Sequence, residues 1–202
     1  MPYHIQILKV SFMRKIPNLK PNLYIVVEGY ADKNTLSKII KEFDLKYNVK
    51  IIDALGSGNI VNRYLDYISK YPYSKILVFY DLDGNKTLKD IKKIFEDKDI
   101  DIDSNFIYFV NPLIEFLWFI SKKKQAIKWT QKKDFVKFIE REFNVLEYKG
   151  TKRQIDKIIN QLNSNDINNM FNNIKKIIGD KDCFIPSTNI LKLKELLEKE
   201  EK

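Results

Sequence analysis

The stretch KILVFYDLDGN, residues 75–85, joins five consecutive apolar residues to a short acidic turn. An apolar run this short, closed by a turn, is typical of a strand that is buried on both faces of a parallel sheet. Ligands of open α/β sheets bind just beyond the carboxyl ends of the strands. The sequence therefore places Asp81 and Asp83 where an α/β enzyme would carry out its chemistry.

The same pattern recurs on both sides of this stretch. We expect strands at residues 23–27, 49–54, 76–80 and 106–110. The segments between them repeat apolar residues at the i, i+3, i+4, i+7 spacing of one helix face. Strands that alternate with helices predict right-handed βαβ units and a parallel sheet. The prediction is an α/β protein with a Rossmann-like, central four-stranded parallel sheet over residues 22–111.

Helix boundaries and the remaining chain complete the predicted organisation. Asp32 or Asn34 is expected to cap the helix after the first strand, because Asp and Asn are preferred N-cap residues. From Leu113 onward the apolar spacing is helical. The expected parts are an N-terminal strand or hairpin extension over residues 1–21, an α/β domain over 22–120, and a basic C-terminal helical extension over 121–202.

The composition limits the class of protein. Of 202 residues, 44% are hydrophobic and 31% charged, which is ordinary for a soluble globular chain. The sequence shows no signal peptide and no apolar run near the roughly 20 residues that span a bilayer, so we expect a cytoplasmic protein without membrane attachment. One His and one Cys make a His/Cys zinc site or a Ser-His-Asp triad a poor explanation. Any metal must then have oxygen ligands, as Mg²⁺, Mn²⁺ and Ca²⁺ do.

Positive charge is concentrated in the C-terminal part. The net charge of +9 divides into +2 over residues 1–115 and +7 over residues 116–202. A lysine-rich surface can simply be solvated, but an excess that adjoins an acidic centre slightly favours a surface that follows phosphates. The lysines expected to bind nucleic acid are Lys122, Lys123, Lys124, Lys128, Lys132 and Lys133.

Acidic residues follow three of the four predicted strands. Glu28 ends the first strand, Asp81 and Asp83 follow the third, and Glu115 comes just after the fourth. In a parallel sheet these ends lie on one edge, so the carboxylates should converge. Carboxylates without basic partners repel one another unless a cation lies between them. A single Asp can merely cap a turn or helix, but the whole set favours a Mg²⁺ or Mn²⁺ site.

The segments VVEGYAD (residues 26–32) and YDLDGN (residues 80–85) resemble the Toprim domain of topoisomerases, bacterial primases and small or phage-exclusion nucleases. That family has Glu-Gly after its first strand and Asp-x-Asp after its third. The resemblance implies a Toprim fold in which Glu28 is the general acid/base and Asp81 and Asp83 hold the metal, with Asp32 as a second acidic ligand. Residues 111–115, NPLIE, look like a segment of some stand-alone Toprim-like defence proteins and make Glu115 a further ligand.

The expected function is that of a Mg²⁺- or Mn²⁺-dependent nuclease, an endonuclease that cuts DNA or structured RNA such as tRNA. The resemblance also suggests antiviral defence, with a partner ATPase or another defence protein on a separate chain. A lysine near the site can steady the developing charge, and Lys86 and Lys33 are the local candidates. The amides of the turn at residues 56–59 can cradle a phosphate, although a plain tight turn explains them equally well. Trp118 and Trp129 can stack on bases, but a buried core position is the better interpretation.

Other interpretations of the same residues remain open. VFYDLDGN also resembles the nucleophile strand of haloacid-dehalogenase-type phosphatases, in which Asp81 would attack phosphorus. Against this, the motif follows two βαβ units, and the family places it on its opening strand. A non-catalytic nucleic-acid- or protein-binding module is the second alternative, although such a module has no need of an intact Glu/Asp/Asp set. The 202 residues leave no room for the strand-passage domain of a topoisomerase, and a primase normally needs further domains. An oligomer is compatible with the sequence.

Overall fold

Four parallel strands form the centre of the fold, and each coincides with a predicted apolar run. The computed structural model describes residues 20–122, 132–177 and 186–198. The parallel strands are β1 (Asn22–Val27), β2 (Asn48–Asp53), β3 (Lys75–Asp81) and β4 (Ile107–Asn111). Their order in the sheet is β2-β1-β3-β4, so the acidic ends of β1 and β3 are neighbours.

A fifth strand, which the sequence did not predict, extends the sheet beyond β4. β5 (Ser187–Thr188) pairs antiparallel to β4. The Asn189 side chain accepts a hydrogen bond from the Phe109 N–H at 2.8 Å and donates one to the Ile107 carbonyl at 3.0 Å. The prediction of four strands was therefore wrong in number, because a two-residue strand leaves no periodic pattern and is held in place by a side chain.

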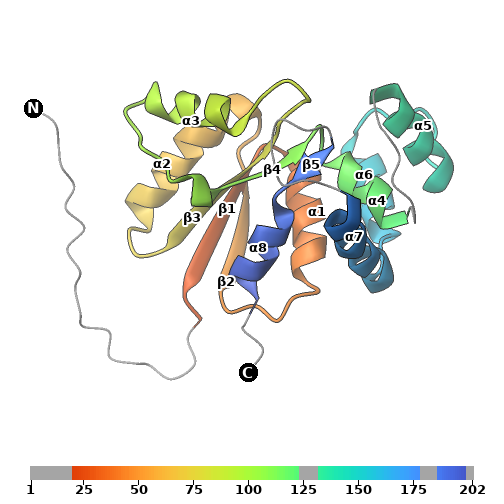
Figure 1. The fold of residues 1–202 in the computed structure, drawn as a ribbon, viewed down its shortest axis with the longest axis horizontal. Coiled ribbons are helices and arrows are strands. Elements are labelled where there is room, and N and C mark those ends of the chain that lie inside the picture. The colour runs from red at the N-terminus through yellow and green to blue at the C-terminus, as the bar shows by residue number, and fades with distance from the viewer. Residues whose placement is uncertain (1–19, 123–131, 178–185, 199–202) are drawn as a thin grey trace, which may run out of the picture.

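Helices cover both faces of the sheet (Figure 1). Alternate residues of β1 and β3 belong to two different hydrophobic clusters, one on each face. One face packs against α2 (Ile60–Lys70) and α3 (Leu88–Glu96). The other face is continuous with a hydrophobic cluster to which a larger group of helices contributes. These are α1 (Tyr30–Ile40), α4 (Glu115–Lys122), α5 (Lys132–Glu142), α6 (Lys152–Asn160), α7 (Ser164–Ile177) and α8 (Ile190–Leu197).

The C-terminal helices share one hydrophobic core with the sheet. Residues of β1 such as Leu23, Phe119 of α4, Phe171 of α7 and Leu197 of α8 belong to a single buried cluster. The predicted helical extension therefore shares its core with the sheet, and α8 contacts β4 directly, while the predicted boundary at residue 120 remains a prediction. The predicted N-terminal extension lies almost wholly outside the described residues, which begin at Lys20.

The start of α1 differs from the prediction, and the difference moves Asp32 into the protein. The helix begins at Tyr30 with Gly29 as its N-cap, and Asp32 is the third helical residue. Its Oδ2 accepts a hydrogen bond from the Gly29 N–H at 2.9 Å, while only 5% of the residue is exposed. Neither Asp32 nor Asn34 is the N-cap, because Gly29 adopts the extended cap conformation directly after Glu28.

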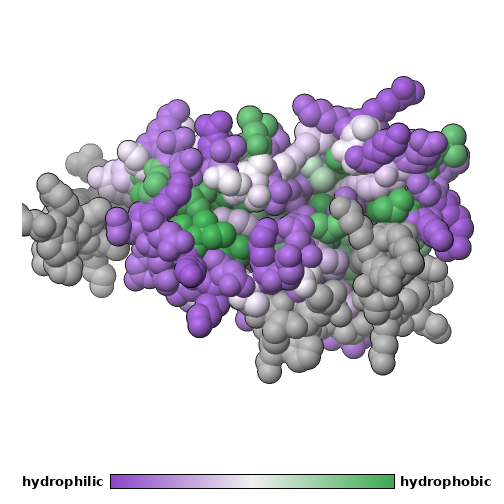
Figure 2. Space-filling model, turned by 90° about the horizontal axis from the view of Figure 1, so that it is seen from above, coloured by the Kyte–Doolittle hydropathy of each residue, from purple (hydrophilic) through white to green (hydrophobic). Residues whose placement is uncertain are grey.

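The outer surface of the described residues is largely polar. In the view from above, hydrophilic side chains cover most of the coloured surface and apolar ones form small patches (Figure 2). The large exposed apolar residues come from several different elements and loops: Leu55, Leu65, Ile68, Tyr73, Ile94 and Leu146. None of the described helices is long and apolar enough to cross a membrane.

Candidate functional site

The carboxyl edge of the parallel sheet gathers the predicted acidic residues. β1 and β3 pair with Val27 opposite Phe79, so Glu28 continues β1 beside the end of β3. β3 and β4 pair up to Asp81 opposite Val110. The chain then stays in contact beyond the strands, since the Asp83 N–H donates to the Pro112 carbonyl at 2.9 Å. Glu28, Asp81 and Asp83 therefore lie on this edge, and Asp32 and Glu115 lie close enough to Asp81 for their charges to raise its pKa. We call these five residues the acid edge (Glu28, Asp32, Asp81, Asp83 and Glu115).

Asp81 is held inside the acid edge with half of its carboxylate unused. Its Oδ2 accepts a hydrogen bond from the Ile114 N–H at 3.1 Å. Its Oδ1 is buried and has no hydrogen-bond partner among the described residues. Burial raises the pKa of Asp81 well above its usual range, and the nearby carboxylates of Asp32 and Glu115 raise it further. An ionised Asp81 thus lacks compensation from the protein itself.

Asp32 repeats this arrangement from the neighbouring helix. Its Oδ1 is also buried without a hydrogen-bond partner among the described residues. Burial raises the pKa of Asp32 to about 7; the Gly29 hydrogen bond opposes this shift, and the charges of Glu28 and Glu115 add to it. Two of the acid-edge carboxylates therefore each present an unpaired oxygen to the protein interior.

Glu28 lies at the partly exposed side of the same edge. Burial raises its pKa, with a further contribution from Asp83, while Lys86 and a hydrogen bond from the Ser57 N–H lower it. The Gly56 N–H donates to the Glu28 carbonyl at 2.8 Å, and Gly56 has a φ of 125°, which favours glycine. The glycine turn predicted as a phosphate cradle therefore directs at least one of its amides at Glu28.

Asp83 and Lys86 form the solvent-facing part of the acid edge. Lys86 Nζ lies 3.0 Å from Asp83 Oδ2, and their side chains are 34% and 48% exposed. Asp83 has a φ of 52°, as the tight turn after β3 requires. Both groups influence the pKa of Glu28, which places the predicted lysine within electrostatic reach of the predicted acid/base.

Glu115 occupies the first turn of α4 and has a partner that the sequence did not reveal. The Tyr148 hydroxyl donates a hydrogen bond to Glu115 Oε1 at 2.9 Å. Tyr148 belongs to the loop between α5 and α6, 33 residues further along the chain. No local pattern separates it from the other ten tyrosines of the chain. Only the packing of α5 against α4 and of α6 against α1 brings it to this edge.

The donor set of the acid edge fits a hard divalent cation, but its atoms do not form a complete coordination shell. Carboxylate oxygens are the preferred ligands of Mg²⁺ and Mn²⁺, and two of these oxygens are buried and unpaired. Across the part of the chain that the structure describes, no group of three or more His, Cys, Asp or Glu residues is arranged to hold a metal ion. A bound cation would therefore have to draw the carboxylates closer together than they lie here.

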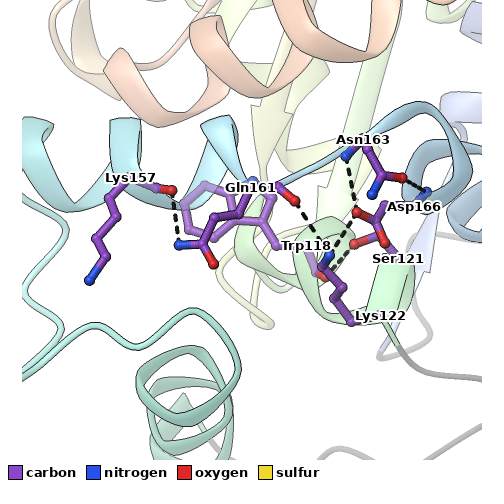
Figure 3. Close-up of polar contacts among 7 residues, drawn as sticks. All are labelled: Trp118, Ser121, Lys122, Lys157, Gln161, Asn163 and Asp166. Atoms are coloured by element: carbon purple, nitrogen blue, oxygen red, sulfur yellow. Dashed lines mark hydrogen bonds and ion pairs between the residues drawn. The ribbon is translucent and has the colours of Figure 1, made fainter.

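Lys122, the first lysine of the predicted nucleic-acid surface, is engaged within the protein (Figure 3). Its Nζ lies 2.7 Å from Asp166 Oδ2, and the two side chains are 20% and 11% exposed. Asp166 also accepts a hydrogen bond from the Asn163 N–H at the start of α7. Lys122 thus ties α4 to α7, and we leave it out of the proposed nucleic-acid contacts.

The structure describes the other predicted nucleic-acid-binding residues only in part. Lys123, Lys124 and Lys128 lie outside the described residues, as does Trp129. Lys132 and Lys133 begin α5, whose backbone is described there and whose side chains at those positions are not. Trp118 is fully buried and donates from Nε1 to Thr35 Oγ1 at 2.9 Å, as the core interpretation predicted.

Replacing Lys122 tests its structural role. Lys122→Ala removes the ammonium group that pairs with the partly buried Asp166 carboxylate. We therefore expect a loss of about 2–3 kcal/mol in the free energy of unfolding. Lys149→Ala is the matched control, because its ion pair with Glu147 is 71% and 83% exposed and should contribute less than about 1 kcal/mol. Urea unfolding of both variants measures the difference. Equal losses would contradict the assigned role of Lys122.

Comparisons with protein-family models, with curated proteins and with solved structures each found no match. The function of this protein therefore has to be argued from the acid edge itself.

Proposed function

We propose that this protein is a Mg²⁺- or Mn²⁺-dependent Toprim nuclease that hydrolyses phosphodiester bonds of DNA or structured RNA. The observation that carries the proposal is the pair of buried, unpaired carboxylate oxygens on Asp32 and Asp81. They lie at the carboxyl edge of a mostly parallel sheet, beside a half-buried glutamate. This is the edge at which α/β proteins bind their ligands.

The energetics of the two aspartates favour a cation as the missing partner. A buried polar atom without a partner costs about 1–3 kcal/mol, and more when it is charged. Two such atoms in neighbouring residues would reduce stability for no benefit if the site only maintained the fold. A divalent cation compensates both charges at once, which accounts for the acid edge better than a plain structural role.

The residues divide into a cation-binding group and a proton-transfer group. Asp81, Asp32 and Glu115 would hold the cation, with Glu28 and Asp83 completing the set from the solvent side. A cation held there would neutralise charge on the scissile phosphate and activate a water molecule. Glu28 is suited to move a proton, because its raised pKa brings it closer to neutral pH than an exposed glutamate. Lys86, next to Asp83, is placed to steady the negative charge that develops on the phosphate.

The burial of Asp81 counts against the phosphatase alternative. A nucleophilic aspartate must reach phosphorus with a free oxygen, yet Oδ2 of Asp81 is bonded to the Ile114 amide and Oδ1 is buried. A small cation can enter such a position more easily than a phosphoryl group. The same unpaired carboxylates also count against a non-catalytic nucleic-acid-binding module, because they would repel a polyanionic ligand.

The proposal is tested by incubating the full chain with linear DNA, tRNA and total RNA, with Mn²⁺ or with EDTA, and mapping the ends of the products. We expect cleavage of at least one nucleic acid in Mn²⁺ and none in EDTA. A generic phosphomonoester substrate is assayed in parallel. Turnover of the phosphomonoester without cleavage of any nucleic acid would favour the phosphatase and reject the nuclease. Addition of ATP and a candidate partner ATPase would then address the suggested role in defence.

The remaining lysines of the predicted surface can be tested through the salt dependence of binding. We expect the triple variant Lys123→Ala/Lys124→Ala/Lys128→Ala to flatten the slope of log K against log salt by about 0.7–0.9 for each phosphate that the variant no longer neutralises. The control carries Lys38→Ala, Lys41→Ala and Lys70→Ala, which lie at the C-terminal ends of α1 and α2, away from the acid edge. Equal slopes for the wild type and both triple variants would show that residues 123–128 do not contact phosphates.

A further inference from the structure

Tyr148 links the C-terminal helices to the acid edge through a single well-formed hydrogen bond. Its hydroxyl donates to Glu115 Oε1 at 2.9 Å, a distance typical of a bond to a carboxylate. We propose that Tyr148 is a positioning residue that orients the carboxylate of Glu115 for binding a divalent cation. This inference rests on the cation site of the proposed function and adds to it a residue from outside the predicted catalytic domain.

Tyr148 is itself fixed from several directions. Its N–H donates to Glu140 Oε1 of α5 at 2.9 Å. Its ring meets Trp118 of α4 edge-on, with ring centroids 6.2 Å apart and an interplanar angle of 84°. Trp118 in turn bonds Thr35 of α1, the helix that carries Asp32. The hydroxyl therefore reaches Glu115 from a side chain that has little freedom to move.

The backbone of the loop that carries Tyr148 is also held by a side chain of α6. The Gln154 side chain of α6 donates to the carbonyls of Leu146 and Glu147 at 3.0 and 3.1 Å. Its Oε1 accepts from the Lys149 N–H at 3.0 Å. A glutamine that bonds the backbone on both sides of Tyr148 holds this part of the loop in place.

The same helix is fastened to the start of α1, two residues after Glu28. The Tyr30 hydroxyl donates to Asp156 Oδ1 of α6 at 2.8 Å, and Lys152 Nζ lies 5.3 Å from the centre of the Tyr30 ring. α6 and its preceding loop are thus anchored to two segments of the acid edge. This double attachment explains how a residue so distant in sequence can hold a defined position there.

The hydrogen bond would set the direction in which Glu115 presents its free oxygen. Oε1 accepts from Tyr148, which leaves Oε2 for other ligands. Partners of this kind fix the orientation of metal-binding carboxylates, and their loss typically lowers metal affinity or activity about 10–100-fold. Tyr148→Phe removes the hydroxyl and keeps the ring, so the packing against Trp118 is retained.

The test measures Mn²⁺ binding to the full chain by the electron paramagnetic resonance signal of free Mn²⁺. We expect Tyr148→Phe to weaken binding about 10–100-fold relative to the wild type. Tyr73→Phe is the matched control, because Tyr73 is 91% exposed and should leave the affinity unchanged. Glu115→Gln should also weaken binding, and adding Tyr148→Phe to Glu115→Gln should have little further effect if the tyrosine acts through the glutamate.

The outcomes separate this inference from the proposed nuclease activity. An unchanged Mn²⁺ affinity in Tyr148→Phe, with or without a lower melting temperature in EDTA, would overturn the positioning role and leave the nuclease intact. Wild-type protein that fails to bind Mn²⁺ would overturn both the positioning role and the cation site. A third outcome is that the wild type binds Mn²⁺, Tyr148→Phe binds it more weakly, and the wild type cuts no nucleic acid. This outcome would confirm the inference and reject the nuclease.

Discussion

Asp81→Asn should make the protein more stable and inactive at the same time. The substitution keeps an oxygen for the Ile114 N–H and replaces a carboxylate that, without a cation, must either carry an uncompensated charge or take up a proton. The buried NH2 group of the asparagine also lacks a partner, but this costs less than the buried charge. In EDTA at about pH 8 we expect a gain of about 1–3 kcal/mol, or several degrees in melting temperature. In Mn²⁺ the same change should lower nucleic-acid cleavage by more than about 100-fold, because a metal ligand is lost.

The opposite signs of these two effects make the prediction specific. A residue that only supports the fold would lose stability when replaced, and activity would decline with it. Asp66→Asn provides a control: Asp66 lies in α2, its side chain is 65% exposed, and its only ion pair among the described residues is an exposed one with Arg63. A loss of stability in Asp81→Asn in EDTA would contradict the account of Asp81 as an uncompensated charge. Unchanged cleavage would show that Asp81 is not a ligand.

The stability of the cation-free protein should fall as the pH rises from about 4 to about 7. The pKa of Asp32 is about 7 in the folded protein, against 3.8 for the ordinary group, so the folded state binds more protons than the unfolded state between these values. Stability therefore decreases with rising pH in this window. A rise of the Asp32 pKa from 3.8 to about 7 corresponds to about 4 kcal/mol, which is an upper bound on the loss of stability.

A divalent cation should reverse this loss. The cation binds the ionised carboxylates of the folded state, so its stabilising effect grows with its concentration relative to the dissociation constant. We expect Mg²⁺ to raise the melting temperature more at about pH 8 than at about pH 5, because protons compete for the same oxygens. Melting curves of the wild type and Asp32→Asn in EDTA and in Mg²⁺ measure both effects. Identical pH slopes for the two proteins in EDTA would contradict the assigned pKa of Asp32.

Much of this arrangement followed from local patterns in the sequence. The four parallel strands were predicted because each is an apolar run that ends in a turn, and the positions of Glu28 and Asp81 followed from those strands. The convergence of strand ends on one edge is a property of parallel sheets. No further information was needed to expect acidic residues there.

Other parts of the site depend on contacts that no local pattern records. Aspartate is a common N-cap residue, yet Asp32 is a buried residue of the first turn of α1, because Gly29 takes the N-cap position. Lys122 belongs to a basic run, but a partly buried aspartate 44 residues away pairs with it. Tyr148 reaches Glu115 only because α5 packs against α4 and α6 packs against α1. For Lys122 and Tyr148 a partner distant in sequence determines what the side chain does, whereas for Asp32 the deciding partner is Gly29, three residues away.

The central claim, that the acid edge carries out phosphodiester hydrolysis, is tested most directly by the single-turnover cleavage rate of Glu28→Gln in Mn²⁺. Glutamine preserves the size of the side chain and its contact with the Ser57 amide, and removes the ability to transfer a proton. We predict a rate about 10²–10⁴-fold below that of the wild type on the same DNA or RNA. Equal rates for the two proteins would contradict the assignment of Glu28 and, with it, the proposed mechanism.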